Sequence, residues 1–263
     1  MNVNYHTHTT RCNHASGTEK EYVEAAIETG LKVLGFSDHT PYPFPDESYA
    51  SYFRMTMEEL ESYVTTVLGL REEYRNDIEI HLGLEVEYYP QFFQALLKEL
   101  STYPIEYFLL AQHNLGNGEL TEPFCYSTLT DDPKRLERYC CQLMEGMDTG
   151  CFTYLAHPDL ISFTGSPEVY DTQMRRLCRH ANAAKLPLEI NLLGIREDRR
   201  YPAEAFWKIA GEEQCDVILG LDAHHVDAFY HPETLLKAQE LAEKYRLKII
   251  ENVELKNPFY NLP

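Results

Sequence analysis

The sequence has no apolar run long enough to cross a membrane, and it is poor in positive charge. A spanning helix needs about 18 or more consecutive apolar residues, and no such run occurs in these 263 residues. The 23 lysines and arginines face 42 aspartates and glutamates, so the formal net charge is −19. This charge repels phosphate backbones and anionic lipid. We therefore expect no nucleic-acid or membrane partner, and an anionic substrate would need a local positive centre.

The cysteines form no metal-binding or disulfide pattern. They are odd in number, scattered, and never spaced as C-x-x-C: Cys12, Cys125, Cys140, Cys141, Cys151, Cys178 and Cys215. This argues against a secreted disulfide framework and against a thiolate zinc site, so we expect buried free thiols. The start, "MNVNYHTH", lacks a basic stretch followed by an apolar one. These features together predict a cytoplasmic protein.

No linker rich in proline, glycine or serine and no break in composition divides the chain, so we expect one domain over residues 1–263. Short apolar runs with β-forming residues alternate with longer stretches of helical spacing. The predicted strands are 3–8, 32–39, 78–88, 107–113, 152–158, 186–194 and 216–225, and a β-like "LKIIENV" follows later. The predicted helices lie near 18–30, 56–76, 91–101, 131–149, 166–185, 203–213 and 233–245, the first opened by a capping box of Thr18 and Glu21.

This alternation is typical of repeated βα units, which form either a closed TIM-like barrel or an open doubly wound sheet. The polar residues favour the barrel. Six of the seven predicted strands end in a side chain that can bind metal, and in a parallel barrel these ends meet at one face. The residues are His6, His8, Asp38, His39, Glu85, His113, His157, Asp222 and His224, and His14 can return from the loop after the first strand.

Each of these residues has a simpler interpretation. A single histidine at a strand end is often a hydrogen-bonded structural residue, and Glu85, like Glu87, could be a half-exposed strand residue. However, seven of the eleven histidines fall at strand ends or in the first loop, which independent accidents would not produce. Histidine with a few carboxylates suits zinc, manganese or iron. Nine ligands exceed the needs of one ion, so we predict two or three divalent ions in a catalytic site with open coordination positions.

The motifs "YHTHT", "HASGT", "GFSDHTP", "GLEVEYY", "AQHNL", "AHPDL", "LEIN" and "GLDAHH" occur in this order between residues 5 and 225. The chain resembles the PHP (polymerase and histidinol phosphatase) superfamily, and within it the stand-alone histidinol-phosphate phosphatases. The resemblance implies a distorted (β/α)7 barrel with three metals at the C-terminal face of the strands. It implies one ion at His6, His8, Glu85 and Asp222, a second at Glu85, His113 and His157, and a third at His14, His39 and His224.

The resemblance also implies an activity. We expect hydrolysis of L-histidinol phosphate to L-histidinol and phosphate, a step of histidine biosynthesis, by attack of a metal-bridged hydroxide on phosphorus. Other members of the superfamily act on nucleotides, so nucleotides or other small phosphate esters are the first alternative. A metal-dependent amidohydrolase also opens its barrel with H-x-H, but often bridges its metals with a lysine where this chain has Glu85. A non-catalytic metal-binding protein would need its open coordination positions filled. The oligomeric state stays open.

Further residues receive candidate roles in this reaction. Glu85 is the expected catalytic bridge, and the ion at His14, His39 and His224 would bind a phosphoryl oxygen. Asp38 would either orient an imidazole or protonate the leaving oxygen. Arg196 would bind phosphate with both arms of its guanidinium, unless it only pairs with Glu197 or Asp198, and Arg11 is a second candidate for the phosphate.

Overall fold

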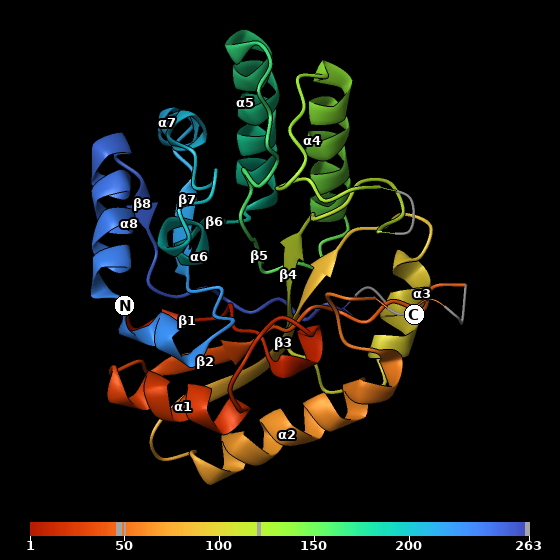
Figure 1. Ribbon diagram of the computed structural model, residues 1–263, viewed down its shortest axis with the longest axis vertical. Coiled ribbons are helices and arrows are strands. Elements are labelled where there is room, and N and C mark those ends of the chain that lie inside the picture. Colours follow the sequence, from red (N-terminus) through yellow and green to blue (C-terminus); the bar gives the residue numbers. More distant parts are fainter. Residues whose placement is uncertain (46–48, 50, 120–121, 261–263) are drawn as a thin grey trace.

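Eight parallel strands form one curved sheet, with helices around it (Figure 1). The computed structural model describes residues 1–45, 49, 51–119 and 122–260. The strands follow one another in chain order: β1 Val3–Asn4, β2 Val33–Phe36, β3 Glu79–Glu87, β4 Tyr107–Ala111, β5 Tyr154–Leu155, β6 Leu188–Asn191, β7 Asp216–Gly220 and β8 Lys248–Ile249. The helices are α1 Glu19–Glu28, α2 Leu60–Glu73, α3 Phe93–Leu100, α4 Pro133–Asp148, α5 Pro167–Ala184, α6 Leu192–Arg196, α7 Glu204–Glu212 and α8 Pro232–Tyr245, with short 3-10 turns at Thr10–Cys12, Met57–Glu59 and Val226–Tyr230.

All seven predicted strands and all seven predicted helices are present, and the predicted α/β barrel is confirmed. The β-like segment after α8 forms the short β8. Most strands are shorter than predicted, for example Val3–Asn4 for 3–8 and Tyr154–Leu155 for 152–158. Residues 192–194, predicted as strand, begin helix α6, because the Asn191 side chain accepts a hydrogen bond from the backbone N–H of Gly194 and so caps a helix there. The capping box of Thr18 and Glu21 at α1 is confirmed.

The first and the last strands of the sheet are paired differently at the two ends of the barrel. Beyond β1 and β7, Thr7 pairs with Ala223, and the N–H of His8 donates to the Ala223 carbonyl at 2.9 Å. In contrast, β8 pairs only with the start of β7, at Asp216 and Val217. Seven strands therefore close the face at the C-terminal ends of the strands, and the eighth lies at the opposite end. This arrangement agrees with the distorted (β/α)7 barrel that the resemblance implies.

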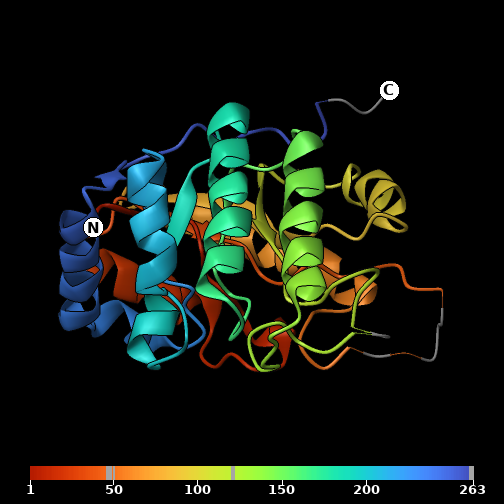
Figure 2. The ribbon, with the colours of Figure 1, turned by 90° about the horizontal axis from the view of Figure 1, so that it is seen from above.

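Alternate residues of each strand point into the barrel or toward the helices. In β4, Phe108 and Leu110 belong to the large core under the helices, whereas Tyr107, Leu109 and Ala111 belong to a smaller cluster inside the barrel. The helices α8, α7, α5 and α4 stand side by side over the larger core (Figure 2). The apolar filling inside the barrel supports the strand ends above it.

The state of the cysteines agrees with the expected free thiols. All seven cysteines are free, and six of them are buried. Among the described residues, no helix is both long and apolar enough to pass through a membrane.

The Tyr107 side chain occupies the space that a Cβ would need at Gly35 and at Gly83 in the barrel wall. This close packing gives a stability prediction. A Cβ on Gly83 would lie 2.3 Å from Cζ of Tyr107, whereas one on Gly69 in helix α2 would meet no atom within 4 Å. We expect Gly83→Ala to destabilise the fold by about 1 to 3 kcal/mol through overpacking. Gly69→Ala, the matched control, should stabilise it by up to about 1 kcal/mol through helix propensity. Urea unfolding of both variants measures the difference, and equal effects would contradict this packing.

Candidate metal centre

The nine predicted ligands converge at the face where the strands end. They follow β1, β2, β4, β5 and β7 or, for Glu85, lie within β3. Eight of the nine are buried, and only His14, in the loop after β1, is exposed. The sequence therefore brings together side chains from six strands over more than 200 residues of chain.

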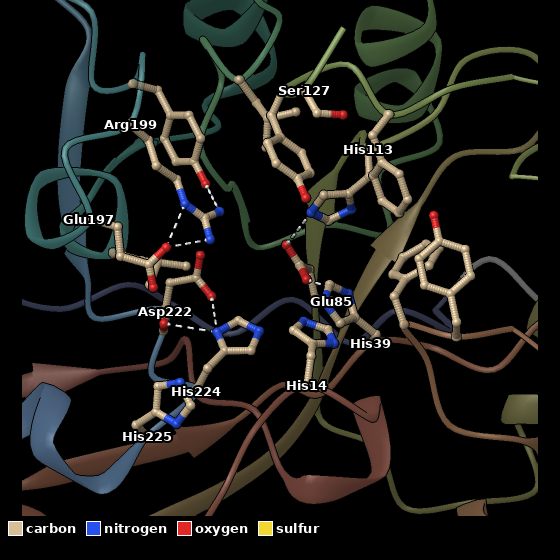
Figure 3. A pocket seen from close by; sticks show the side chains of 17 residues that line it. His14, His39, Glu85, His113, Ser127, Glu197, Arg199, Asp222, His224 and His225 are labelled. Atoms are coloured by element: carbon tan, nitrogen blue, oxygen red, sulfur yellow. Dashed lines mark hydrogen bonds and ion pairs between the residues drawn. The ribbon is translucent and has the colours of Figure 1, made fainter.

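Glu85 lies at the centre of this cluster (Figure 3). Its Oε1 is 2.7 Å from Nε2 of His157 and 3.5 Å from Nε2 of His6. Its Oε2 is 2.8 Å from Nδ1 of His39 and 3.6 Å from Nε2 of His8. The Nε2 atom of His113 lies 3.7 Å from Oε1. One carboxylate thus faces five imidazoles, which is the position a bridging ligand needs.

Asp222 forms a second anionic point beside Glu85. Its Oδ1 lies 3.1 Å from Nε2 of His8, 3.5 Å from Nε2 of His6 and 3.3 Å from Nδ1 of His224. The His14 ring stacks on the His224 ring at 4.6 Å and lies 5.3 Å from the His39 ring. The three histidines assigned to one ion by resemblance are therefore neighbours.

Several atoms of the cluster are buried and form no hydrogen bond of suitable geometry with the described residues, although some, such as Nδ1 of His39 and Oε2 of Glu85, lie close together. They are Nε2 of His6, His8 and His224, Nδ1 of His39 and His157, Oε2 of Glu85 and Oδ1 of Asp222. Burying unpaired polar atoms is unfavourable, so such a concentration needs an explanation. Groups of three donors that lie within 4.8 Å of one another include His6, His8 and Asp222, then His6, Glu85 and His157, and then His8, His39 and His224. The donor set fits divalent transition metals.

Three carboxylates orient the imidazoles from behind. The Nδ1 of His6 lies 2.7 Å from Glu189, that of His113 lies 2.9 Å from Glu87, and that of His8 lies 3.3 Å from Asp38. Such partners fix the tautomer of a histidine and direct its other nitrogen toward a metal. The sequence reasoning missed Glu87 and Glu189. Glu87 could have been found, because it lies two residues from Glu85 on the same strand and so on the same face.

Glu85, Asp222 and His224 have pKa values shifted toward the forms that bind metal. Burial raises the pKa of Glu85, but His39, His113 and His6 outweigh it and hold the pKa well below its ordinary value. Burial likewise raises the pKa of Asp222, and His6 and His224 reverse the effect. Burial and the neighbouring His8 hold the pKa of His224 well below its ordinary value. The carboxylates are therefore anionic, and His224 is neutral, the form of imidazole that binds metal.

A cavity of about 540 Å³ opens onto the cluster. Its lining includes His14, His39, Glu85, His113, Asp222 and His224 from the cluster, the aromatic residues Tyr52, Phe53, Phe124 and Tyr126, and Glu197, Arg199 and Tyr201 from the loop after α6. The Arg199 guanidinium lies 2.6 Å from Glu197 and donates to the Tyr201 hydroxyl at 2.7 Å (Figure 3). Arg199 is the arginine that the structure places at the cavity.

The structure places three other predicted residues away from the cavity lining. Arg196, in α6, does not line it, and its two terminal guanidinium nitrogens are buried without a hydrogen-bond partner in the described part of the chain. The Arg11 guanidinium is occupied by Glu19 and Ser62 and ties α1 to α2. The Asp38 carboxylate is fully buried and accepts hydrogen bonds from the N–H groups of Thr9 and His39, which suits orienting His8 better than protonating a leaving group.

Comparisons with known proteins agree with this geometry. The chain is 30% identical to a probable histidinol-phosphatase of Deinococcus radiodurans, over 83% of this chain and 85% of the relative. It is 36% identical to the histidinol-phosphatase of Bacillus subtilis, over 37% of this chain and 38% of that one. The crystal structure of histidinol phosphate phosphatase from Lactococcus lactis, in complex with zinc, L-histidinol and phosphate, has the same fold, with a TM-score of 0.75 and 17% identity over 98% of this chain and 97% of that one. The family model of the PHP domain matches residues 4–192, and the chain therefore belongs to the PHP domain family.

Proposed function

We propose that this protein is a metal-dependent phosphomonoesterase that hydrolyses L-histidinol phosphate to L-histidinol and phosphate. The observation that carries the proposal is the convergence of nine metal-capable side chains at one face of the barrel, many with unpartnered buried atoms, six of which line one cavity. Its sequence relatives are named histidinol-phosphatases. The structural neighbour with bound zinc, L-histidinol and phosphate supports the same substrate class.

We propose that the nine ligands hold two or three ions of zinc, manganese or iron. His6, His8 and Asp222, with Glu85, are suited to one ion, Glu85 with His113 and His157 to a second, and His14, His39 and His224 to a third. When bound, such ions acidify water to near neutral pKa and offset the charge of a phosphoryl group. They would also supply the positive centre that an anionic substrate needs in a chain of net charge −19.

The residues around the ligands divide the remaining tasks. Glu189, Glu87 and Asp38 hold the imidazoles of His6, His113 and His8 in one orientation, so that the centre is preorganised. Arg199 presents a guanidinium to the cavity, where it suits a phosphate oxygen. The aromatic residues of the cavity lining offer a flat apolar surface to the imidazole ring of the substrate.

A phosphate-release screen tests this function. The purified protein with added manganese or zinc is compared on L-histidinol phosphate, nucleoside monophosphates and sugar phosphates by phosphate release, and on a small amide by release of the amine. We expect kcat/KM to be highest for L-histidinol phosphate by at least about tenfold, since the site must discriminate through contacts beyond the phosphate. Preference for nucleotides by a wide margin would contradict the substrate, and hydrolysis of the amide alone would contradict the chemistry.

Arg196, at the end of α6, and Arg199, in the loop that follows, give a prediction. Because Arg199 lines the cavity and Arg196 does not, Arg199→Ala should raise KM for L-histidinol phosphate by about ten- to a hundredfold, the effect of losing a charged hydrogen bond. Metal content should stay unchanged. Arg196→Ala is the matched variant and should alter KM little. Steady-state kinetics measure both KM values. A larger rise of KM in Arg196→Ala than in Arg199→Ala would mean that Arg196, the residue predicted from the sequence, binds the phosphate.

We also propose that the protein works in the cytoplasm and without a nucleic-acid partner. Seven free thiols suit a reducing compartment. The strong negative charge opposes binding to phosphate backbones.

A further inference from the structure

Arg54 is one of the largest fully buried side chains of the molecule, yet it lies in the irregular segment between β2 and α2. Its guanidinium forms a fork on Glu87, with Nη1 3.0 Å from Oε2 and Nη2 3.1 Å from Oε1. It also donates to Glu119 at 3.0 Å and to the carbonyl of Thr40 at 2.8 Å. Every arm of the guanidinium is therefore engaged, and none faces the cavity.

The fork on Glu87 reaches the metal centre through one further contact. Oε1 of Glu87 accepts from Arg54 and also lies 2.9 Å from Nδ1 of His113. With Nδ1 engaged in this way, Nε2 of His113 is the nitrogen left to face Glu85, 3.7 Å away. A chain of direct contacts thus runs from Arg54 through Glu87 to a proposed metal ligand.

His113 differs from the other two oriented histidines in how its carboxylate is held. Glu189, behind His6, accepts from the neutral amide of Asn191 at 2.7 Å, two residues along the same strand. Asp38, behind His8, accepts from the N–H groups of Thr9 and His39. Of these three carboxylates, Glu87 is the one fixed by a charged side chain from a loop, 33 residues away in sequence.

The same loop forms part of the cavity wall. Phe53 lines the cavity, and its ring lies 5.3 Å from the His39 ring and 6.0 Å from the His113 ring. The Arg54 guanidinium lies 4.2 Å from the centre of the Phe53 ring. Arg54 therefore contacts both the wall residue and the carboxylate that orients His113.

We propose that Arg54 is a positioning residue: it fixes Glu87 so that His113 is held toward Glu85, and it couples this orientation to the cavity wall at Phe53. This inference rests on the proposed metal centre. A purely stabilising role is a poor explanation of the network, because the desolvation of a buried ion pair offsets most of its attraction. A planar fork with two parallel hydrogen bonds fixes geometry, which a lysine cannot reproduce.

Zinc retention tests the proposal without measuring activity. Zinc-loaded protein is dialysed against graded concentrations of a competing chelator, and the zinc left per chain is measured. Arg54→Lys should hold at least one zinc equivalent about 10- to 100-fold more weakly, the usual effect of losing a partner behind a ligand. Glu119→Gln, which removes the other carboxylate on Arg54 but leaves Glu87 and His113 in place, should retain zinc as the wild type does.

Glu87→Gln provides a second route if the lysine variant fails to fold. Because Arg54 acts through Glu87, Glu87→Gln should weaken the binding of the same zinc equivalent. The double variant, with Arg54→Lys and Glu87→Gln, should bind zinc no more weakly than whichever single variant binds it less tightly. If the variants at both positions fold and retain zinc as the wild type does, the positioning role of Arg54 is wrong, whereas the proposed function is unaffected. A wild-type protein that holds at most one zinc equivalent would instead count against the proposed function and remove the basis of this inference.

Discussion

Replacement of Glu85 by glutamine is expected to abolish phosphatase turnover. The side chain lies between five imidazoles, and both of its oxygens face the cluster. Glutamine keeps the size but removes the negative charge that two metal ions would share. We expect kcat/KM to fall by at least about a thousandfold, comparable to the loss of a strong electrostatic contact in other sites, and at least one metal equivalent to be lost.

Glu79→Gln is the matched control, because Glu79 lies on the same strand but is exposed at its other end. It should keep wild-type activity and metal content. Kinetics and elemental analysis of both proteins measure the difference. If Glu85→Gln retained its metals and a substantial part of its turnover, Glu85 would not be the bridging ligand.

His14→Ala is expected to reduce catalytic efficiency severely while sparing most of the metal. His14 stacks on His224 at the exposed side of the cluster and makes no contact with Glu85 or Asp222 shorter than 4 Å among the ion pairs of the described chain. The variant should therefore keep the ions nearest Glu85 and lose the one proposed to hold a phosphoryl oxygen. We expect kcat/KM to fall by about a hundredfold or more through loss of transition-state stabilisation. His224→Ala should behave similarly.

His180→Ala is the control for a histidine outside the cluster, since His180 lies on α5 and pairs with Asp148. It should leave both metal content and kinetics unchanged. Near-wild-type activity in His14→Ala and His224→Ala would remove the role of the third ion and leave a centre of two ions.

The order of the elements could be predicted because strong local signals repeat along this chain. Apolar runs mark the strands, and caps such as Thr18 with Glu21 mark the helices. The extent of the strands could not be predicted. Next to His6 and at His39 only isolated bridges extend the regular strands, and His157 lies in a bend with a positive φ of 30°.

The proposed ligands could be located because parallel strands bring their ends to one face, whatever the details of packing. The residues behind and around them could not be found in this way. Arg54 and Phe53 lie in an irregular loop with no periodicity, and only the folded chain shows that Arg54 meets Glu87. The sequence placed Arg196 at the end of a strand, whereas residues 192–196 form helix α6 and Arg199, not Arg196, lines the cavity.

The metal content of the protein tests the central claim most directly. Protein purified without chelators is analysed for first-row transition metals, and its phosphatase activity and circular dichroism are measured before and after chelation. The nine convergent donors predict more than one equivalent per chain, and chelation should abolish activity while the barrel, whose core is apolar, stays folded. A content firmly at or below one equivalent, or full activity after chelation, would contradict the account.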